Sequence, residues 1–427
     1  MMASTFNNKI NDNTFAKYCS TIILAGLILF VIFLPIGYST AVMYIGLLIS
    51  LLGWIAKLIY HRLRGILGCR YLDIPICILI GLGIISTALS PEFTVSLRRF
   101  WKIIQGIILF YLVVNNLHQR KDILQLVIAM LVVAGLISIY GVICYLTKTR
   151  LTYDNRLLAT FKYPNYLAAY LTIMMPLCMG FFIGGLRTGL KRKQRWKYLM
   201  LLGIGLSAMG GSLIFTLTRG AWIAVAVAII YLIIVFDKRF ISVLLVLLAI
   251  SPFMMPKHIK SRFMTMIQHQ QGFMGERPYW WRAALEMIQE HPLKGIGPGR
   301  FKTEYMLRKP EGLRENPDQC HNTYLQIALE MGIPALFVFL WIVSLLFWMI
   351  LRTRKIIASE NTTSTVHKTW DTGFIIGISA SIIAYLIHGF TDNVLQRRAL
   401  LIFWFIAGLL GASLNEKEKP QTIRQHV

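Results

Sequence analysis

Charged residues are scarce in this chain, and acidic residues are the scarcest of them. Only 15% of its 427 residues are charged, with 19 Asp and Glu against 44 Lys and Arg. A soluble protein carries about a quarter charged residues, so the composition excludes an ordinary soluble fold. The apolar runs contain almost no carboxylates, whereas transporters driven by protons or sodium normally need them within the membrane. Transport of a lipid-linked anion is therefore a weaker interpretation.

Cysteines are few and scattered, and familiar metal and nucleotide motifs are missing. The six cysteines form no C-x-x-C pair, which argues against a disulfide framework or a structural zinc site. Without D-x-D, H-E-x-x-H or Walker sequences, we expect no catalytic metal, no direct use of ATP and no cofactor. The net charge of +25 does not indicate nucleic acid, because no basic stripe is interleaved with stacking aromatic residues.

Long apolar runs fill most of the chain. Hydrophobic residues make up 56% of it, and the runs approach the roughly 20 residues that a helix needs to cross a bilayer. Because backbone polar groups cannot reach water in lipid, each run should be helical. We therefore predict an all-α, polytopic transmembrane helix bundle of about twelve spans. The predicted spans are residues 21–35, 39–57, 72–90, 100–117, 123–147, 166–186, 198–217, 221–236, 240–256, 323–351, 371–390 and 399–414.

The distribution of Lys and Arg predicts the orientation of the bundle. Basic residues concentrate in alternate loops, most densely at 187–197, and in both tails. Cytoplasmic loops carry such an excess, so we expect both termini to be cytoplasmic. The polar stretch before Thr21 is interpreted as a cytoplasmic tail and not as a cleaved signal peptide. The same basic face should attract anionic membrane lipids.

One outer loop is much longer than the others and divides the chain. The predicted parts are residues 1–256 with nine spans, the outer loop 257–322, residues 323–414 with three spans, and the tail 415–427. A single long loop on a bundle is where function tends to concentrate. We therefore expect the loop to carry site residues.

The long loop contains a predicted amphipathic helix. Pro278 can open a helix at its first position, and Pro292 ends it, so we expect a helix on the outer membrane surface. Arg277 stands at its N-terminus, where free N–H groups and the helix dipole favour an anion. Arg282 lies further along and is a weaker candidate. Residues 295–299, Gly-Ile-Gly-Pro-Gly, indicate a tight turn and not a nucleotide site, because no strand precedes them.

The short outer loops contain cations that the distribution rule disfavours there. These residues are Arg98, Arg99, Lys102, Lys148, Arg150, Arg156, Lys162 and Arg219. Contacts with aromatic rings or lipid phosphates would explain most of them, and the sharper hypothesis is an anionic ligand at the outer surface. Arg219 is the strongest case, because it lies between two apolar spans with almost no loop. A charge so close to lipid usually faces the bundle interior or a wet cavity.

His321 lies where the tenth predicted span begins. A lone histidine near a membrane surface is more often structural, yet a helix N-terminus favours neutral imidazole, which can accept a proton near pH 7. Cys320 beside it suggests a Cys–His pair, but sequence neighbours at a helix start usually point apart. His388 is the one obvious ionisable residue inside a span, and Asp392 is placed to partner it.

Four stretches together resemble the O-antigen ligase family, which shares a superfamily with O-antigen polymerases. They are Arg156 with Phe161–Ala168, Thr218–Trp222, Arg277–Phe301, and His321-Asn322 followed after nine residues by Gly332. The resemblance covers roughly residues 156–395, and the first third matches only in hydropathy. One position departs from it. Three residues after Gly332 the ligase pattern often has Gly, Thr or Tyr, but this chain has Ala335, which leaves ligase or polymerase open.

The resemblance implies a metal-independent glycosyltransferase of lipopolysaccharide biosynthesis, acting on the periplasmic face of the bacterial inner membrane. A ligase would transfer a glycan from undecaprenyl diphosphate to a sugar hydroxyl of lipid A–core, inverting the anomeric centre. A polymerase would instead join lipid-linked repeat units. His321 would be the general base, and arginine suits the diphosphate because it is permanently charged and bidentate. The expected diphosphate residues are Arg219, Arg277 and Arg156. The expected supporting residues are Asn322, Arg282 and Asn165.

Overall fold

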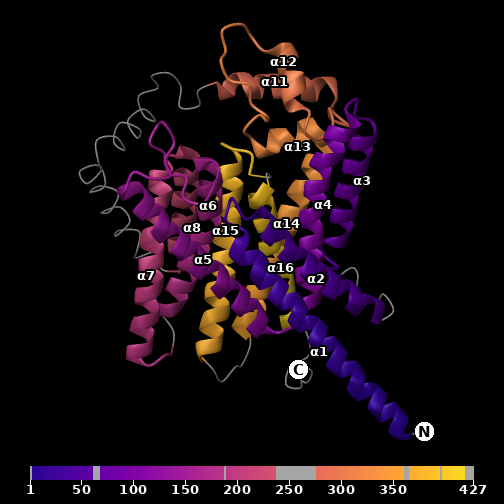
Figure 1. Ribbon diagram of the computed structural model, residues 1–427, viewed down its shortest axis with the longest axis vertical. Coiled ribbons are helices and arrows are strands. Elements are labelled where there is room, and N and C mark those ends of the chain that lie inside the picture. The colour runs from indigo at the N-terminus through magenta and orange to yellow at the C-terminus, as the bar shows by residue number, and fades with distance from the viewer. Residues whose placement is uncertain are drawn as a thin grey trace.

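The computed structural model describes residues 2–60, 68–186, 189–236, 276–359, 365–394 and 397–418, and it confirms a helical bundle (Figure 1). The first eight helices are α1 (Met2–Phe33), α2 (Thr40–Tyr60), α3 (Asp73–Ala88), α4 (Phe93–Asn116), α5 (Arg120–Leu146), α6 (Pro164–Leu186), α7 (Arg192–Phe215) and α8 (Arg219–Phe236). The others are α11 (Arg277–Glu290), α12 (Phe301–Arg308), α13 (Thr323–Met331), α14 (Ile333–Ser359), α15 (Thr365–Gly389) and α16 (Arg397–Glu418).

The described helices account for most of the predicted spans. Nine of them are long and apolar enough to cross a membrane, which confirms a polytopic architecture. Helix α3 is apolar but only 16 residues long. Helix α4, at 24 residues, covers the predicted span 100–117 except for its last residue. The predicted span 240–256 lies outside the described residues. The total of about twelve spans therefore stays a prediction.

The structure divides the predicted span 323–351 into two helices. Helix α13 ends at Met331 and α14 begins at Ile333, with Gly332 between them at φ 87°. A Cβ atom at Gly332 would lie 2.1 Å from the carbonyl oxygen of Leu293. The backbone therefore bends where only glycine fits. The membrane-length helix starts at Ile333, and α13 packs with α11 and α12.

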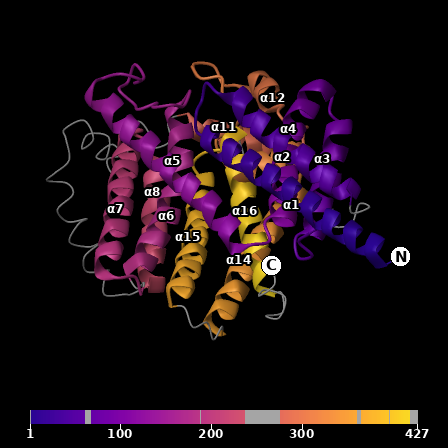
Figure 2. The same cartoon turned by 60° about the horizontal axis from the view of Figure 1, so that its bottom comes forward.

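Helices α6, α15 and α16 form the enclosed centre of the bundle (Figure 2). In each of these three helices, between 72% and 83% of the apolar 18-residue stretch is buried, compared with 28% in α7. Helices α6 and α15 meet through glycines, since a Cβ atom on Gly180 would lie 2.4 Å from the Cα atom of Gly377. Small residues allow such close approach between membrane helices. The outer ends of α6 and α15 are therefore held by the best-packed part of the molecule.

Helices α11, α12 and α13 gather at one end of the bundle (Figure 1). The predicted helix between Pro278 and Pro292 is confirmed as α11. Its apolar face, which includes Ala284 and Met287, packs in a buried cluster with Phe301 of α12 and with α13. The expectation of a helix lying on the membrane surface therefore needs correction, because protein already covers the face that would have met lipid.

The glycine-rich turn fastens these outer helices to the bundle. Gly295, Gly297 and Gly299 all have positive φ angles, from 69° to 99°. The amides of Gly297 and Gly299 donate to the Glu330 carbonyl and carboxylate at 3.1 and 2.9 Å, and Ser86 of α3 donates to the same carbonyl at 2.7 Å. These amides are occupied by α13, so the turn acts as a structural clamp.

Candidate active site

His321 is held in place by the start of α13. Its φ angle is 53°, an uncommon value for a residue other than glycine. Asn322 follows it as the N-cap of α13, and its side-chain oxygen accepts hydrogen bonds from the amides of Tyr324 and Leu325 at 3.0 and 3.1 Å. The amide nitrogen of Asn322 donates to the carbonyl of Phe390 at 3.3 Å. The cap therefore ties α13 to the outer end of α15 and fixes the backbone from which His321 projects.

The imidazole of His321 is paired with Asp392, which follows α15. Its Nδ1 lies 2.7 Å from Oδ1 of Asp392. Burial alone would raise the pKa of Asp392, but the charges of His321 and Arg277 more than offset this effect and hold it well below its usual value. An ionised carboxylate can only accept hydrogen bonds, so Nδ1 carries the proton. Nε2 of His321 is then the nitrogen able to accept a proton from a substrate.

Asn165 and Arg156 extend this pair into a chain of hydrogen bonds. Asn165, on the first turn of α6, donates from Nδ2 to Oδ2 of Asp392 at 2.8 Å. Its Oδ1 accepts from Nη2 of Arg156 at 2.6 Å. Nε of Arg156 in turn donates to the carbonyl of Thr216 at 3.0 Å. Four segments distant in sequence therefore converge on one network, and the orientation of the Asn165 amide is fixed from both sides.

A cavity of about 310 Å³ brings the predicted cations together with this network. It is lined by Arg156, Arg219, Arg277 and His321. Arg219 opens α8 and Arg277 opens α11, so two helix N-termini and three guanidinium groups face the same space. Such an arrangement favours a ligand with several anionic oxygens.

Two glutamates line this cavity in addition to Asp392. Glu276 accepts hydrogen bonds from the amides of Arg314 and Glu315, at 2.9 and 3.1 Å, through its two carboxylate oxygens. Glu315 is exposed. The first carboxylate is thus engaged in holding the outer loop, and the second is open to solvent. The interior of the cavity remains suited to an anion.

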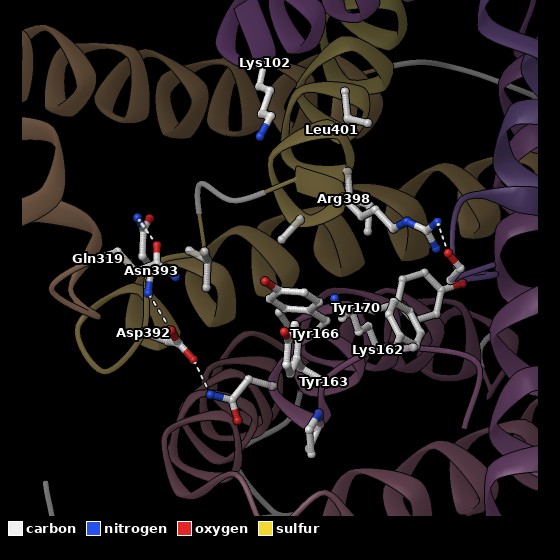
Figure 3. A pocket seen from close by; sticks show the side chains of 18 of the residues that line it. Lys102, Lys162, Tyr163, Tyr166, Tyr170, Gln319, Asp392, Asn393, Arg398 and Leu401 are labelled. Carbon is white, nitrogen blue, oxygen red and sulfur yellow. Dashed lines mark hydrogen bonds between the residues drawn. The ribbon is translucent and has the colours of Figure 1, made fainter. Parts of the chain in front are cut away.

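A second cavity, of about 540 Å³, shares His321 and Asp392 with the first cavity as lining residues. Aromatic and basic side chains face its interior (Figure 3). They include Tyr44, Tyr163, Tyr166, Tyr170, Lys102, Lys162 and Arg398. Tyrosine faces bind sugar rings by stacking and offer a hydroxyl for hydrogen bonding. His321 therefore lines both the arginine-lined cavity and the tyrosine-lined cavity.

One predicted site residue, Arg282, lies away from the network. Its side chain is 82% exposed, pairs with Glu286 at 3.2 Å and lines neither cavity. Its position therefore does not support the expected supporting role. The reason is helical phase: Arg282 lies five positions after Arg277, which rotates it by about 140° around α11.

Cys320, for which no pairing with His321 was expected, makes its hydrogen bond elsewhere. Cys320 is fully buried among the outer helices, and its Sγ lies 3.4 Å from the carbonyl oxygen of Asn322, to which it donates. Burial raises the pKa of this thiol, which keeps it protonated. Cys320 therefore serves packing.

The sequence interpretation missed the partner of His321. It placed Asp392 beside His388, whereas the carboxylate oxygens contact His321 and Asn165. The available signal was the polar run Thr391–Asn393 directly after an apolar span. It did not indicate which of the two histidines the carboxylate would meet.

A comparison with known families points to the family that the sequence resembles. Residues 204–340 match the family model described as O-antigen ligase. Over this stretch the chain is similar to the O-antigen ligase family. The matched segment contains Arg219, Arg277 and His321, whereas Arg156 and Asp392 lie outside it. The resemblance inferred from sequence is thereby confirmed, and with it a membrane function of the O-antigen ligase or polymerase type. No curated protein matches the chain.

Proposed function

We propose that the chain is a glycosyltransferase that moves a glycan from undecaprenyl diphosphate to a sugar hydroxyl of lipid A–core. The observation that carries the proposal is the position of His321. It is paired with Asp392 at 2.7 Å and lines both the arginine-lined and the tyrosine-lined cavity. A base in that position can reach an acceptor on one side while the leaving group is held on the other.

The arginine-lined cavity is suited to the diphosphate of the donor. As the bond between the anomeric carbon and the phosphate oxygen breaks, negative charge grows on the leaving diphosphate. Arg219 and Arg277 can stabilise that charge without losing their own, because the guanidinium group stays protonated. Arg156 lines both cavities and can contact the phosphate nearest the sugar. These groups would perform the part that a metal ion plays in other transferases.

His321 supplies the base in this scheme. Nε2 accepts the proton of the acceptor hydroxyl while its oxygen attacks the anomeric carbon from the side opposite the diphosphate. Asp392 stabilises the imidazolium that forms, as carboxylates do in other histidine-based sites. One direct displacement inverts the configuration at the anomeric carbon, and the leaving diphosphate takes the electron pair of the broken bond.

The tyrosine-lined cavity is suited to the acceptor sugar, and a polymerase acceptor is the second candidate. The departure from the ligase pattern at Ala335 leaves this choice open. Ala335 is fully buried in the bundle core and lines neither cavity. A second lipid-linked repeat unit would present a sugar hydroxyl to the same base.

The position of the chain ends supports the predicted orientation. Near the end of α16, Glu418 accepts a hydrogen bond from Tyr71 at 3.2 Å, and Tyr71 precedes α3. Ser86, at the other end of α3, contacts the outer helices. The N-terminus of α1 also lies far from α11 and α12 (Figure 1). We propose that this far end is cytoplasmic and that the active site faces the periplasm of a bacterial inner membrane.

A reconstituted assay tests the function and separates the two acceptors. Purified protein in lipid vesicles is supplied with undecaprenyl-diphosphate-linked glycan and with lipid A–core, and the products are resolved by mass. We expect one glycan to be joined to lipid A–core with release of undecaprenyl diphosphate. Lengthened lipid-linked glycans in the absence of lipid A–core would identify a polymerase. No transfer to either acceptor by folded protein would overturn the proposal.

A further inference from the structure

His388 is a buried polar residue that the scheme above does not use. It lies at the outer end of α15, is 1% exposed and lines the arginine-lined cavity. Neither ring nitrogen has a hydrogen-bond partner among the described residues. Buried polar groups are paired in the large majority of cases, so an imidazole with two unpaired nitrogens facing a cavity points to a ligand.

The neighbours of His388 have their hydrogen bonds elsewhere. Asp392, the acidic group close by, directs Oδ1 to His321 and to the amide of Asn393, and Oδ2 to Asn165. The backbone of His388 is also fixed, since its carbonyl accepts from the amide of Asp392 at 3.0 Å. The side chain is therefore held at the cavity wall while the adjacent carboxylate is already satisfied.

We propose that His388 is a further binding residue for the donor diphosphate, an inference that rests on the proposed function. A ring N–H of His388 donates a hydrogen bond to a non-bridging phosphate oxygen, beside Arg219 and Arg277. Imidazole has at least one N–H in both of its protonation states, so the donor is present in either case. A hydrogen bond to a charged oxygen is among the stronger ones in proteins.

The burial of His388 distinguishes its proposed binding role from that of the arginines. Arg219 and Arg277 are partly exposed, whereas His388 is almost completely enclosed. A phosphate oxygen that reaches His388 has lost most of its hydration. The contact therefore favours binding of a ligand that fills the cavity. We therefore expect His388 to favour a diphosphate over a monophosphate, which has fewer oxygens to offer.

Binding measurements on full-length protein in nanodiscs test this inference. The probes are undecaprenyl diphosphate and undecaprenyl monophosphate. His388→Phe keeps an aromatic ring but removes the N–H donor, and His388→Gln keeps a donor. Ile387→Leu, on the adjacent and partly buried position, is the matched control. We expect His388→Phe to weaken diphosphate binding about 10-fold or more, with little change for the monophosphate, partial recovery in His388→Gln and native binding in Ile387→Leu.

The outcomes separate this inference from the proposed function. If Arg219→Ala and Arg277→Ala bind undecaprenyl diphosphate as the native protein does, the cavity is not the donor site and both fail. If those variants lose binding while folded His388→Phe binds normally, only the role of His388 is refuted. Should His388→Phe fail to fold, His388→Gln and His388→Leu are compared instead. Loss of folding in all three would assign His388 to packing and overturn the inference.

Discussion

Replacing Asp392 with asparagine tests the pairing at the centre of the site. The substitution keeps the shape of the side chain but gives it one oxygen and one NH₂ group. In the native protein, Oδ2 accepts from Asn165, and Oδ1 contacts Nδ1 of His321 and accepts from the amide of Asn393. Because all three groups donate, either orientation of the new amide sets its NH₂ group against a donor.

The network determines which orientation costs less. Asn165 cannot flip freely, since its oxygen accepts from Arg156 at 2.6 Å. The asparagine oxygen therefore turns to Asn165, and its NH₂ group faces His321. That NH₂ group donates to Nδ1, which moves the imidazole proton to Nε2 and removes the base. We expect the rate of transfer to fall roughly 10²–10⁴-fold. The clash with the Asn393 amide should lower the free energy of unfolding by about 1–3 kcal/mol.

The assay measures kcat for glycan transfer and binding of undecaprenyl diphosphate on the same preparation. Binding should persist, because the arginines remain. The double variant His321→Ala with Asp392→Asn should be no slower than His321→Ala alone, since the two residues act as one unit. A variant Asp392→Asn with native kcat would refute the pairing as the source of the base. Rate losses that multiply in the double variant would show that the two residues act separately.

Four further predictions follow from the structure. Arg219→Lys and Arg277→Lys should recover little of the activity lost in the alanine variants, because a point charge lacks the bidentate fork; full transfer by both lysine variants would contradict their assignment to the diphosphate. In a background without native cysteines, Pro310→Cys should react with an impermeant thiol reagent in intact cells and Lys193→Cys should not, and the reverse pattern would invert the topology. The pKa of Asp392 is lowered in the folded protein, so its ionised form stabilises the fold at pH values above the unfolded pKa of about 3.9, and this stabilisation is lost as the pH falls through the lower folded pKa. The difference in melting temperature between native protein and Asp392→Asn should therefore stay constant from about pH 7 to 5. A decline in that difference across the interval would argue against a lowered pKa. Gly332→Ala should lower the melting temperature strongly, since the left-handed backbone and the Leu293 carbonyl leave no room for a Cβ atom, and an unchanged melting temperature would show that the break between α13 and α14 is not needed.

Charges in unusual places made much of the site predictable from sequence. Arg219 was identifiable because a cation between two apolar spans needs a wet or interior location, and Arg277 because it precedes a helix that begins with proline. Both line the same cavity as His321. The bundle itself followed from run length and hydropathy, which depend on local sequence alone.

What the sequence did not provide was relative position. Asp392 lies 71 residues from His321 in sequence, and no local pattern indicates that two such residues are in contact. Helical phase moved Arg282 to the exposed side of α11. The break at Gly332 was hidden for a similar reason, because the apolar run continues through it and the cause is a tertiary contact with Leu293.

The position of Arg156 links donor binding to the base. Arg156 lines the arginine-lined cavity, and its Nη2 group also donates to Asn165, which donates to Asp392, which accepts from His321. In each of these hydrogen bonds, one group can only donate and the other can only accept. A diphosphate that binds Arg156 would leave the orientation of Asn165 unchanged as long as the Nη2 contact persists, so the proton on His321 stays on Nδ1 while the donor is bound. Removing the guanidinium in Arg156→Ala would leave the oxygen of Asn165 with the longer hydrogen bond from Thr218, at 3.3 Å, so the amide would hold Asp392 less firmly. Arg156 therefore has two tasks, and we expect its loss to lower kcat as well as donor affinity. Among the described residues, Arg277 makes no hydrogen bond to this chain and acts on Asp392 through its charge, so its loss should mainly lower affinity for the diphosphate.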